Sequence, residues 1–273
     1  MKKTYEALLR DMEALFAQAL EGEVGAHLGL RQAMDYSFSS GGKRVRPLLL
    51  FASLKAYSQD LEEAIPFACA LECIHTYSLI HDDLPAMDDD DFRRGQPSSH
   101  KKFGEAMAIL AGDGLLNLSA QLVLKGIKDL SPDKRARGLE AASYLFFSSG
   151  IGGMVDGQAH DIAKEEEVPR EFLYREKTGA LLSAALAMGG ILGGAQAEEV
   201  EKLKEMGYIL GVGYQFQDDL FDLREDKRAP QEKAHFEALA GDYNRRAWEL
   251  LESMEGDFQD LEDLFKRLLD RRR

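Results

Sequence analysis

Apolar residues recur every three to four positions along most of the chain, which is the spacing of one face of an α-helix. Residues 71–80, 206–223 and 236–271 follow this spacing, and no stretch shows the sustained Val/Ile/Thr alternation that is typical of strands. The pattern therefore predicts an all-α protein. The first stripe, between residues 4 and 20, consists of Tyr5, Leu8, Leu9, Met12, Leu15, Phe16 and Leu20.

Loops and one uncharged segment divide the helical pattern. Residues 39–42 and 131–133 are rich in Ser, Gly, Pro or Asp and predict loops. Residues 178–197 carry no charge and are long enough to cross a membrane, but they are mostly Ala, Gly and Ser. This composition favours a central helix that its neighbours bury on all sides, and no membrane span is expected.

Length, composition and net charge limit the expected domain organisation, partners and location of the protein. A chain of 273 residues with 45% hydrophobic composition can bury a sizeable core, so a single domain over residues 1–273 is expected. The net charge of −14 speaks against nucleic acid or anionic membranes as partners. The start of the chain lacks a signal-peptide pattern, which makes a cytoplasmic location the expectation. Cys69 and Cys73 lie four apart and are expected to be reduced thiols in the core.

Residues 80–95 contain six aspartates within ten positions, and two arginines follow after Phe92. Pro85 predicts that the preceding helix ends near Asp83, so the carboxylates gather at a helix C-terminus, where the macrodipole is already negative. Carboxylate oxygens in this density favour a hard cation, and Mg²⁺ is usually bound by one or two carboxylates together with substrate phosphate. Arg93 and Arg94 are suited to bind the same phosphate oxygens. The alternative is a solvated acidic loop.

A second acidic cluster strengthens the metal hypothesis. Asp218 and Asp219 lie in the apolar run 206–223, and Asp222 falls on the same helical face as Asp218. Charges inside an apolar helix are unfavourable unless they have a partner. We expect the two clusters to face each other across a pocket and to bind a diphosphate through several metal ions.

A loop near residue 42 offers further cations for an anionic substrate. Gly41 and Gly42 precede Lys43, Arg44 and Arg46 at the start of a predicted helix, an arrangement suited to a diphosphate, although Arg44 is expected to be simply solvated.

A lysine and three histidines are further candidates. Lys177, at the head of the uncharged segment, requires an anion, and a substrate phosphate would provide it. His75 lies two helical turns before Asp82 on the same face, while His81 and His100 are weaker candidates.

Five ordered blocks give the chain a specific resemblance, and from the first to the last they span about two thirds of it. It resembles the trans-isoprenyl diphosphate synthases (polyprenyl synthetases), and most of all the bacterial type of farnesyl diphosphate synthase. The blocks are GGKRVRP (41–47), ECIHTYSLIHDDLPAMDDDDFRRG (72–95), HKKFGEAMAILAGD (100–113), KTGAL (177–181) and YQFQDDLFD (214–222). The resemblance implies the isoprenoid synthase fold, which is a helical bundle with a central substrate cavity, and a homodimer.

The resemblance also implies roles for residues. It implies Mg²⁺ as the cofactor, with three ions per active site, and isopentenyl and allylic diphosphates as substrates. The metal ligands would be Asp82, Asp83, Asp88, Asp218, Asp219 and Asp222. Isopentenyl diphosphate would be bound by Lys43, Arg46, His75 and Arg94, and the allylic diphosphate and nascent carbocation by Arg93, Lys177, Thr178, Gln215 and Lys233.

Tyr77 and Ser78 are the candidates for control of product length. Tyr77 lies five residues before Asp82, about 7 to 8 Å along the helix, on the side where the growing chain must extend. In the family an aromatic residue there accompanies C15 products, so farnesyl diphosphate is expected. A geranylgeranyl diphosphate synthase, with a C20 product, is the alternative within the class.

The segment after Asp222 departs from the family pattern. It is several residues shorter than usual, and Ala234, His235 and Phe236 stand where hydroxylated residues are common. This feature favours a second alternative, a non-catalytic partner subunit of an active synthase. A structural acidic bundle would leave the basic residues unexplained, and a terpene cyclase would have little use for a second diphosphate site at Lys43 and Arg46.

Overall fold

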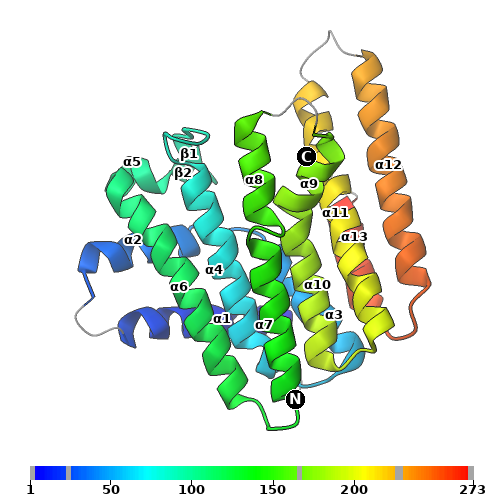
Figure 1. Ribbon diagram of the computed structural model, residues 1–273, viewed down its shortest axis with the longest axis horizontal. Helices are drawn as coiled ribbons and strands as arrows, with labels where there is room; N and C mark the ends of the chain where they lie inside the picture. The colour runs from blue at the N-terminus through cyan, green and yellow to red at the C-terminus, as the bar shows by residue number, and fades with distance from the viewer. Residues whose placement is uncertain (1–3, 23–25, 165–167, 225–229, 270–273) are drawn as a thin grey trace. The chain divides into compact units, whose positions relative to one another are not determined.

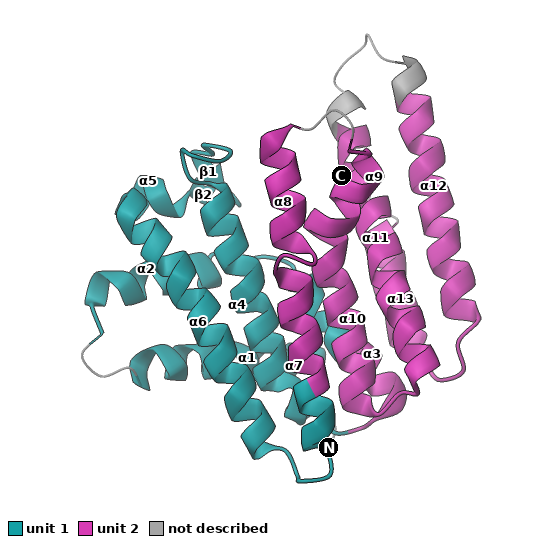
Figure 2. Ribbon diagram, viewed as in Figure 1, with its two compact units in different colours: residues 1–51, 60–139 teal, residues 52–59, 140–273 magenta. Residues whose placement is uncertain are grey.

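The computed structural model describes residues 4–22, 26–164, 168–224 and 230–269, which form α-helices and one short β-hairpin (Figure 1). The chain divides into two compact units, one of residues 1–51 and 60–139 and the other of residues 52–59 and 140–273 (Figure 2). The all-α prediction is confirmed, and the one addition among the described residues is a hairpin with two residues in each strand.

Unit 1 is built around the pairing of α4 with α6. Helix α4 begins with Pro66 in its first turn and is buried over most of its length because almost all of its residues are apolar. It ends at Asp82, as Pro85 predicts. The elements are α1 (Tyr5–Gly22), α2 (Leu28–Ser39), the first part of α3 (Val45–Tyr57), a 3₁₀ turn η1 (Leu61–Ala64), α4 (Ile65–Asp82), strands β1 (Phe92–Arg93) and β2 (Gln96–Pro97), α5 (Ser99–Phe103) and α6 (Glu105–Asp129).

Unit 2 is built around α10 and α11, which lie side by side (Figure 1). Its elements are most of α7 (Arg135–Ser149), α8 (Met154–Ala163), α9 (Arg170–Tyr174), a π-helical turn η2 (Arg175–Gly179), α10 (Ala180–Gly193), α11 (Ala197–Arg224), α12 (Pro230–Glu252) and α13 (Gln259–Leu269). The π-helical turn is a rare conformation that is frequent at functional sites.

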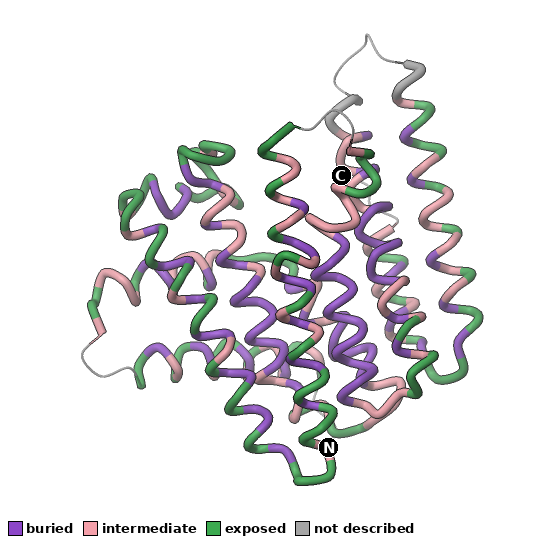
Figure 3. Tube along the Cα trace, viewed as in Figure 1, coloured by how far each residue is buried: buried purple, intermediate pink, exposed green. Residues whose placement is uncertain are grey.

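Helix α10 confirms the prediction of a central buried helix. Every residue from Ala180 to Leu192 is buried, and the helix appears as a continuous buried segment in Figure 3. Gly194 ends the helix in the left-handed conformation, with φ of 85°, which only glycine adopts readily.

Two glycines bring α11 unusually close to the start of α10. A Cβ atom added at Gly207 would lie 2.2 Å from Ser183 Cα, and one added at Gly211 would lie 2.3 Å from Gly179 Cα. Both distances are far below van der Waals contact. Because Gly207, Gly211 and Gln215 follow each other at four-residue spacing, they share one face of α11, and this contact positions the site residues one turn further along.

The last part of the chain differs from the prediction of one long helix over residues 236–271. It forms two helices, α12 and α13, with a break at residues 253–258. Gly256 has a φ of 154°, which a helix does not contain, and the break lets Phe258 pack in an edge-to-face contact with Tyr57. The expectation for Cys69 and Cys73 is confirmed, since both are buried free cysteines.

The glycine contact predicts a large effect of one methyl group. Gly207→Ala is expected to lower the free energy of unfolding by about 1 to 3 kcal/mol, because the added Cβ forces the backbones of α10 and α11 apart. Gly241→Ala is the matched control, since nothing lies within 4 Å of its added Cβ in α12, and it is expected to stabilise the protein by about 0.4 to 1 kcal/mol. Urea denaturation of both variants checks this, and equal effects would contradict it.

Candidate active site

The first acidic cluster is folded back on the end of α4. After Asp83 the chain makes a tight turn, in which Met87 N donates to Leu84 O at 2.8 Å and Asp88 N donates to Asp82 O at 2.9 Å. The second bond brings the backbones of Asp82 and Asp88 together at the C-terminus of α4. Two carboxylate residues six positions apart therefore meet at one helix end.

Arg93 and Lys101 bind four of the six aspartates of this cluster. Arg93 Nε donates to Asp83 Oδ1 at 2.8 Å, and its Nη2 is 3.0 Å from Asp90 Oδ2. Lys101 Nζ lies 2.7 Å from Asp91 and 3.7 Å from Asp89. Asp88 is exposed and forms no ion pair within the described part of the chain. Four of the aspartates are therefore paired with cations of the protein itself, and Asp88 differs from them in having no such partner among the described residues.

Asp83 differs from its neighbours because its side chain is buried, with only 3% of it exposed. Burial raises the pKa of Asp83, and the hydrogen bonds from Arg93 oppose that change. Of the predicted metal ligands in this cluster, Asp83 is therefore the one that holds Arg93 in place.

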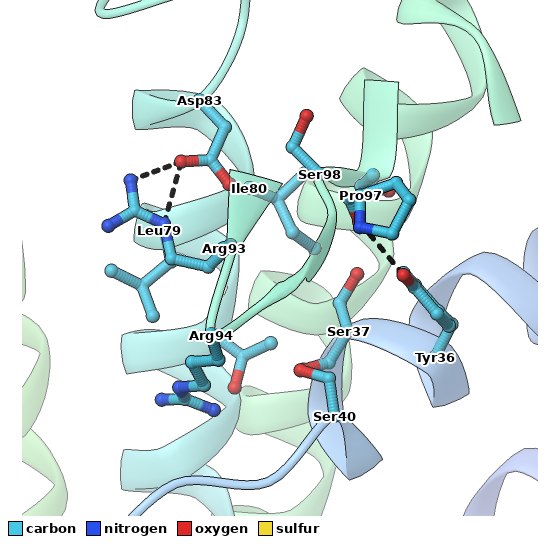
Figure 4. Close-up of a pocket in the computed structure, with 12 residues that line it drawn as sticks. Tyr36, Ser37, Ser40, Leu79, Ile80, Asp83, Arg93, Arg94, Pro97 and Ser98 are labelled. Carbon is cyan, nitrogen blue, oxygen red and sulfur yellow. Dashed lines mark hydrogen bonds and ion pairs between the residues drawn. The ribbon is translucent and has the colours of Figure 1, made fainter. Parts of the chain in front are cut away.

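A pocket lies behind the Asp83–Arg93 pair and is shown in Figure 4. Along α4 its lining residues fall on the face of Thr76, Ile80 and Asp83, which is rotated from the face of His75 and Asp82. Tyr36 closes one side, where its hydroxyl donates to Pro97 O at 2.8 Å. We assign no substrate to it. The lining residues are Tyr36, Ser37, Ser40, Thr76, Leu79, Ile80, Asp83, Arg93, Arg94, Pro97, Ser98 and Ser99.

The predicted basic cluster is assembled in unit 1. Arg46 Nη1 lies 3.2 Å from His75 Nε2, and Arg94 Nη1 donates to Gly41 O. A Cβ atom at Gly42 would lie 2.7 Å from Arg94 Cζ, so only glycine leaves room for this guanidinium. The structure therefore brings Arg46, His75 and Arg94 to the loop of residues 40–44, where Lys43 is exposed.

The expectation that Arg44 is solvated is wrong. Arg44 is 7% exposed and donates to Glu72 Oε1 at 2.8 Å and to Phe38 O at 2.8 Å. Glu72 is buried as well and supplies the charge that a buried guanidinium requires. Arg44 has a φ of 46°, which is rare for a residue other than glycine, and the buried contacts hold it there. His100, the weaker candidate beside Lys101, is buried as well.

His75 is held in its neutral form. Burial lowers its pKa well below the usual value, and the positive charges of Arg46 and Arg94 lower it further. Because arginine only donates, Nε2 of His75 accepts from Arg46 and the ring proton resides on Nδ1. Ser78, one turn on, donates its hydroxyl to His75 O at 2.9 Å.

In unit 2, two of the residues predicted to bind the allylic substrate contact each other, and a third, Lys177, has a partner that was not predicted. Thr178 Oγ1 donates to Gln215 Oε1 at 3.2 Å, so these two residues meet as expected. Lys177 already has a counter-ion without substrate, because its Nζ lies 2.6 Å from Asp161 Oδ2 on α8. Gly157 makes this approach possible, since an added Cβ would lie 2.4 Å from Lys177 N.

The second acidic cluster lies on the last turns of α11. Tyr174 donates its hydroxyl to Asp219 Oδ2 at 2.5 Å, and its ring packs edge-on against Phe216 with centroids 5.2 Å apart. Burial and this bond raise the pKa of Tyr174, which keeps the phenol protonated as a donor. The side chain of the predicted ligand Asp222 lies outside the described residues, and Lys233 lies partly exposed in α12.

The sequence reasoning missed three partner residues, one in unit 1 and two in unit 2. They are Asp161, Tyr174 and Glu72, which pair with Lys177, Asp219 and Arg44 respectively. No sequence pattern linked Asp161 to a lysine 16 positions away.

Sequence comparison relates the chain to known proteins. Residues 28–260 match the sequence profile of the Polyprenyl synthetase family. A farnesyl diphosphate synthase from Geobacillus stearothermophilus is 47% identical over 200 residues, which are 71% of this chain and 66% of that relative.

Solved structures agree with this relationship. An FPP/GFPP synthase from Zymomonas mobilis, in its apo form, superposes with a TM-score of 0.85 at 34% identity, over 97% of both chains. A geranyltransferase from Helicobacter pylori, solved with magnesium and isoprenyl diphosphate, gives a TM-score of 0.79 at 29% identity, over 97% of this chain and 95% of that one. The all-α isoprenoid synthase fold is confirmed.

The lowered pKa of His75 predicts a pH-dependent stability. The unfolded histidine takes up a proton below about pH 6.5 while the folded one resists, so stability should fall as pH drops below that value, by at most about 1.4 kcal/mol per pH unit. His75→Gln should remove this part of the slope. Urea denaturation between pH 7.5 and 5 measures it, with His27→Gln at an exposed position as control. An unchanged slope in His75→Gln would contradict the assignment.

Proposed function

The chain belongs to the polyprenyl synthetase family, and from this premise we propose that it is a trans-prenyltransferase that makes farnesyl diphosphate. In this reaction isopentenyl diphosphate condenses with dimethylallyl or geranyl diphosphate. The observation that carries the proposal is that the chain has two ways to bind a diphosphate, one through metal ions and one through basic side chains. The carboxylates at the ends of α4 and α11 suit metal-bound diphosphate, and the cluster of Arg46, His75 and Arg94 suits a diphosphate bound directly.

The basic cluster is the proposed site for isopentenyl diphosphate. His75 orients Arg46 and Gly41 O orients Arg94, so both guanidinium groups are held in place before a diphosphate binds. Lys43 adds an exposed ammonium at the same loop. A neutral His75 leaves the net charge of the cluster to the arginines and Lys43, which matches a dianionic or trianionic group.

Mg²⁺ fits the carboxylates that the structure provides. Among the described residues no three His, Cys, Asp or Glu side chains form a metal-binding group by themselves. Mg²⁺ commonly takes one or two carboxylates and completes its shell with water and phosphate, and Asp82 with Asp88 offers that number. The proposal therefore assigns Asp82, Asp88 and Asp218 to Mg²⁺, with Asp219 and Asp222 in support and three ions per site.

The reaction gives each of these residues a role. The aspartates would hold Mg²⁺, which would withdraw electron density from the leaving diphosphate. Arg93, Lys177 and Lys233 are assigned to the oxygens on which charge grows as the allylic C–O bond breaks, and Lys177 would exchange its ion pair with Asp161 for one with the diphosphate. Thr178 and Gln215, which share a hydrogen bond, would supply oxygen atoms to the allylic cation. The double bond of isopentenyl diphosphate then forms the new C–C bond, and the released diphosphate takes the proton that is lost. This sequence requires no nucleophilic side chain.

Tyr77 is the proposed end of the chain-binding tunnel, and Ser78 lies beside it. Tyr77 is 7% exposed. Its position on α4 is about 7 to 8 Å before Asp82 along the helix axis. A bulky, fixed ring at this distance favours C15 over the C20 product of the alternative enzyme. The second alternative, a non-catalytic partner subunit, rests on the segment after Asp222, of which residues 225–229 lie outside the described chain.

We further propose that the protein forms a homodimer through α6. Ile109, Leu116 and Leu124 recur at seven- or eight-residue spacing on one side of this helix and are 44%, 38% and 56% exposed. Such a stripe is suited to a second copy of the same helix. Within the described residues, α6 is also the one helix whose length and composition would allow it to cross a membrane.

The reaction predicts a metal-dependent C15 product. Purified protein with dimethylallyl and isopentenyl diphosphates should form farnesyl diphosphate with Mg²⁺ and none with EDTA, as measured by chromatography of the dephosphorylated products. Asp88→Asn should lower kcat/KM about 100-fold or more, whereas Asp91→Asn, whose carboxylate is bound to Lys101, should stay within about threefold. Folded protein without any product would favour the partner-subunit alternative.

Tyr77→Ala predicts a longer product. Removing the ring opens space beyond the C15 chain, so C20 should become the main product at a similar rate of the first condensation. Tyr77→Phe, which keeps the ring, is the control and should still give C15. A C15 product from Tyr77→Ala would exclude this residue from the role.

The dimer is tested by light scattering after gel filtration. Leu116→Glu together with Leu124→Glu should convert a dimer into a monomer, because the glutamates would be buried at the interface without partners. Gln121→Glu, on the same exposed helix, should remain dimeric. A monomeric wild-type protein that binds phospholipid vesicles would instead favour a membrane contact of α6.

A further inference from the structure

The ring of His81 on α4 fills the space that a side chain at Gly112 on α6 would take. A Cβ atom at Gly112 would lie 2.1 Å from His81 Nε2, 2.6 Å from its Cδ2 and 2.9 Å from its Cε1. Three ring atoms within 3 Å mean that any larger residue at position 112 would displace the imidazole. Of the glycines in α6, Gly112 makes the shortest such contact.

The imidazole of His81 is fixed on two further sides. Its Nε2 lies 3.2 Å from Ile109 O, where an N–H can donate to the carbonyl. Its ring meets the ring of Tyr77 edge-on, with centroids 5.8 Å apart and an angle of 71° between the planes. Tyr77 and His81 are four residues apart and therefore neighbours on one face of α4. The contacts form a chain from Gly112 through His81 to Tyr77.

We propose that His81 and Gly112 are specificity-determining residues that set product length by holding the Tyr77 ring in one orientation. This inference rests on the proposed function, in which Tyr77 ends the tunnel. A phenol ring blocks an elongating chain only while its χ1 and χ2 angles stay fixed, because a tyrosine can otherwise turn to another rotamer. His81 supplies the aromatic edge against which the ring rests, and Gly112 supplies the space that His81 requires.

His81→Ala tests the contact directly. It leaves Tyr77 in the sequence but removes the ring that restrains it, so the ratio of C20 to C15 product should rise about threefold to tenfold, as expected from releasing one rotamer. His81→Phe keeps an aromatic edge without the hydrogen bond and should retain C15. A purely structural role would change stability or rate in both variants and leave the product ratio unchanged.

Gly112→Ala approaches the same contact from the other helix. The added methyl must displace His81, so the product ratio should shift in the same direction. In the His81→Ala background, Gly112→Ala should add nothing, because the ring it would displace is gone. This dependence in a double-mutant cycle identifies a shared contact.

Gly126→Ala is the matched control on the same pair of helices. An added Cβ there would meet Pro66 Cβ at 2.9 Å and Phe67 Cε2 at 3.1 Å, near the other end of α4. It should destabilise the α4–α6 packing without changing the product ratio. A shift in Gly126→Ala equal to that in Gly112→Ala would overturn the proposal, since general loosening would then suffice.

The outcomes separate this inference from the proposed function. Longer product from His81→Ala and Gly112→Ala, with C15 from Gly126→Ala, supports it. If Tyr77→Ala lengthens the product while His81→Ala and Gly112→Ala give wild-type C15, the inference is wrong and the proposed function stands. If wild-type protein makes no prenyl diphosphate, both are wrong.

Discussion

The crowding of carboxylates at the end of α4 is the constraint on which the rest of the structure depends. Six aspartates within ten positions repel one another, and the helix C-terminus adds partial negative charge to the same place. The protein neutralises part of this charge with Arg93 and Lys101, which bind Asp83, Asp90, Asp89 and Asp91. Asp88 stays exposed and is joined to Asp82 through the backbone. The hairpin that carries Arg93 therefore does two things. It stabilises the acidic loop, and it limits the number of carboxylates available to a metal ion.

Close backbone contacts at glycines position the remaining site residues. Gly207 and Gly211 bring α11 against the start of α10, and Gln215 follows on the same face, within reach of Thr178. Gly157 brings α8 against the π-helical turn that carries Lys177, so that Asp161 can pair with it. Side chains held by backbone contacts of this kind keep their geometry without a substrate, which lowers the entropy lost on binding.

Local patterns predicted much of the fold. The end of α4 near Asp83, the burial of α10 and the break between α6 and α7 were all predicted, because proline, uncharged composition and turn residues act over a few positions. Contacts between distant residues were not predicted. Arg44 is buried because Glu72 lies 28 positions away, and Lys177 has a counter-ion because of Asp161. The break before α13 was missed as well, since the apolar spacing continues across residues 253–258 and only the backbone of Gly256 reveals it. The assigned roles of the site residues, Tyr77 among them, stay predictions.

The central proposal is that the carboxylates of each acidic cluster bind Mg²⁺ together with a diphosphate. The most direct measurement is a crystal structure of the protein with Mg²⁺ and an unreactive allylic thiodiphosphate. The account predicts ions about 2.0 to 2.1 Å from oxygens of Asp82 and Asp88 and from an oxygen of Asp218, each ion also bound to diphosphate oxygen. It also predicts that Asp83 still binds Arg93, as it does here. A diphosphate held by the cluster of Arg46, His75 and Arg94 alone, with ions at neither set of aspartates, would contradict the account.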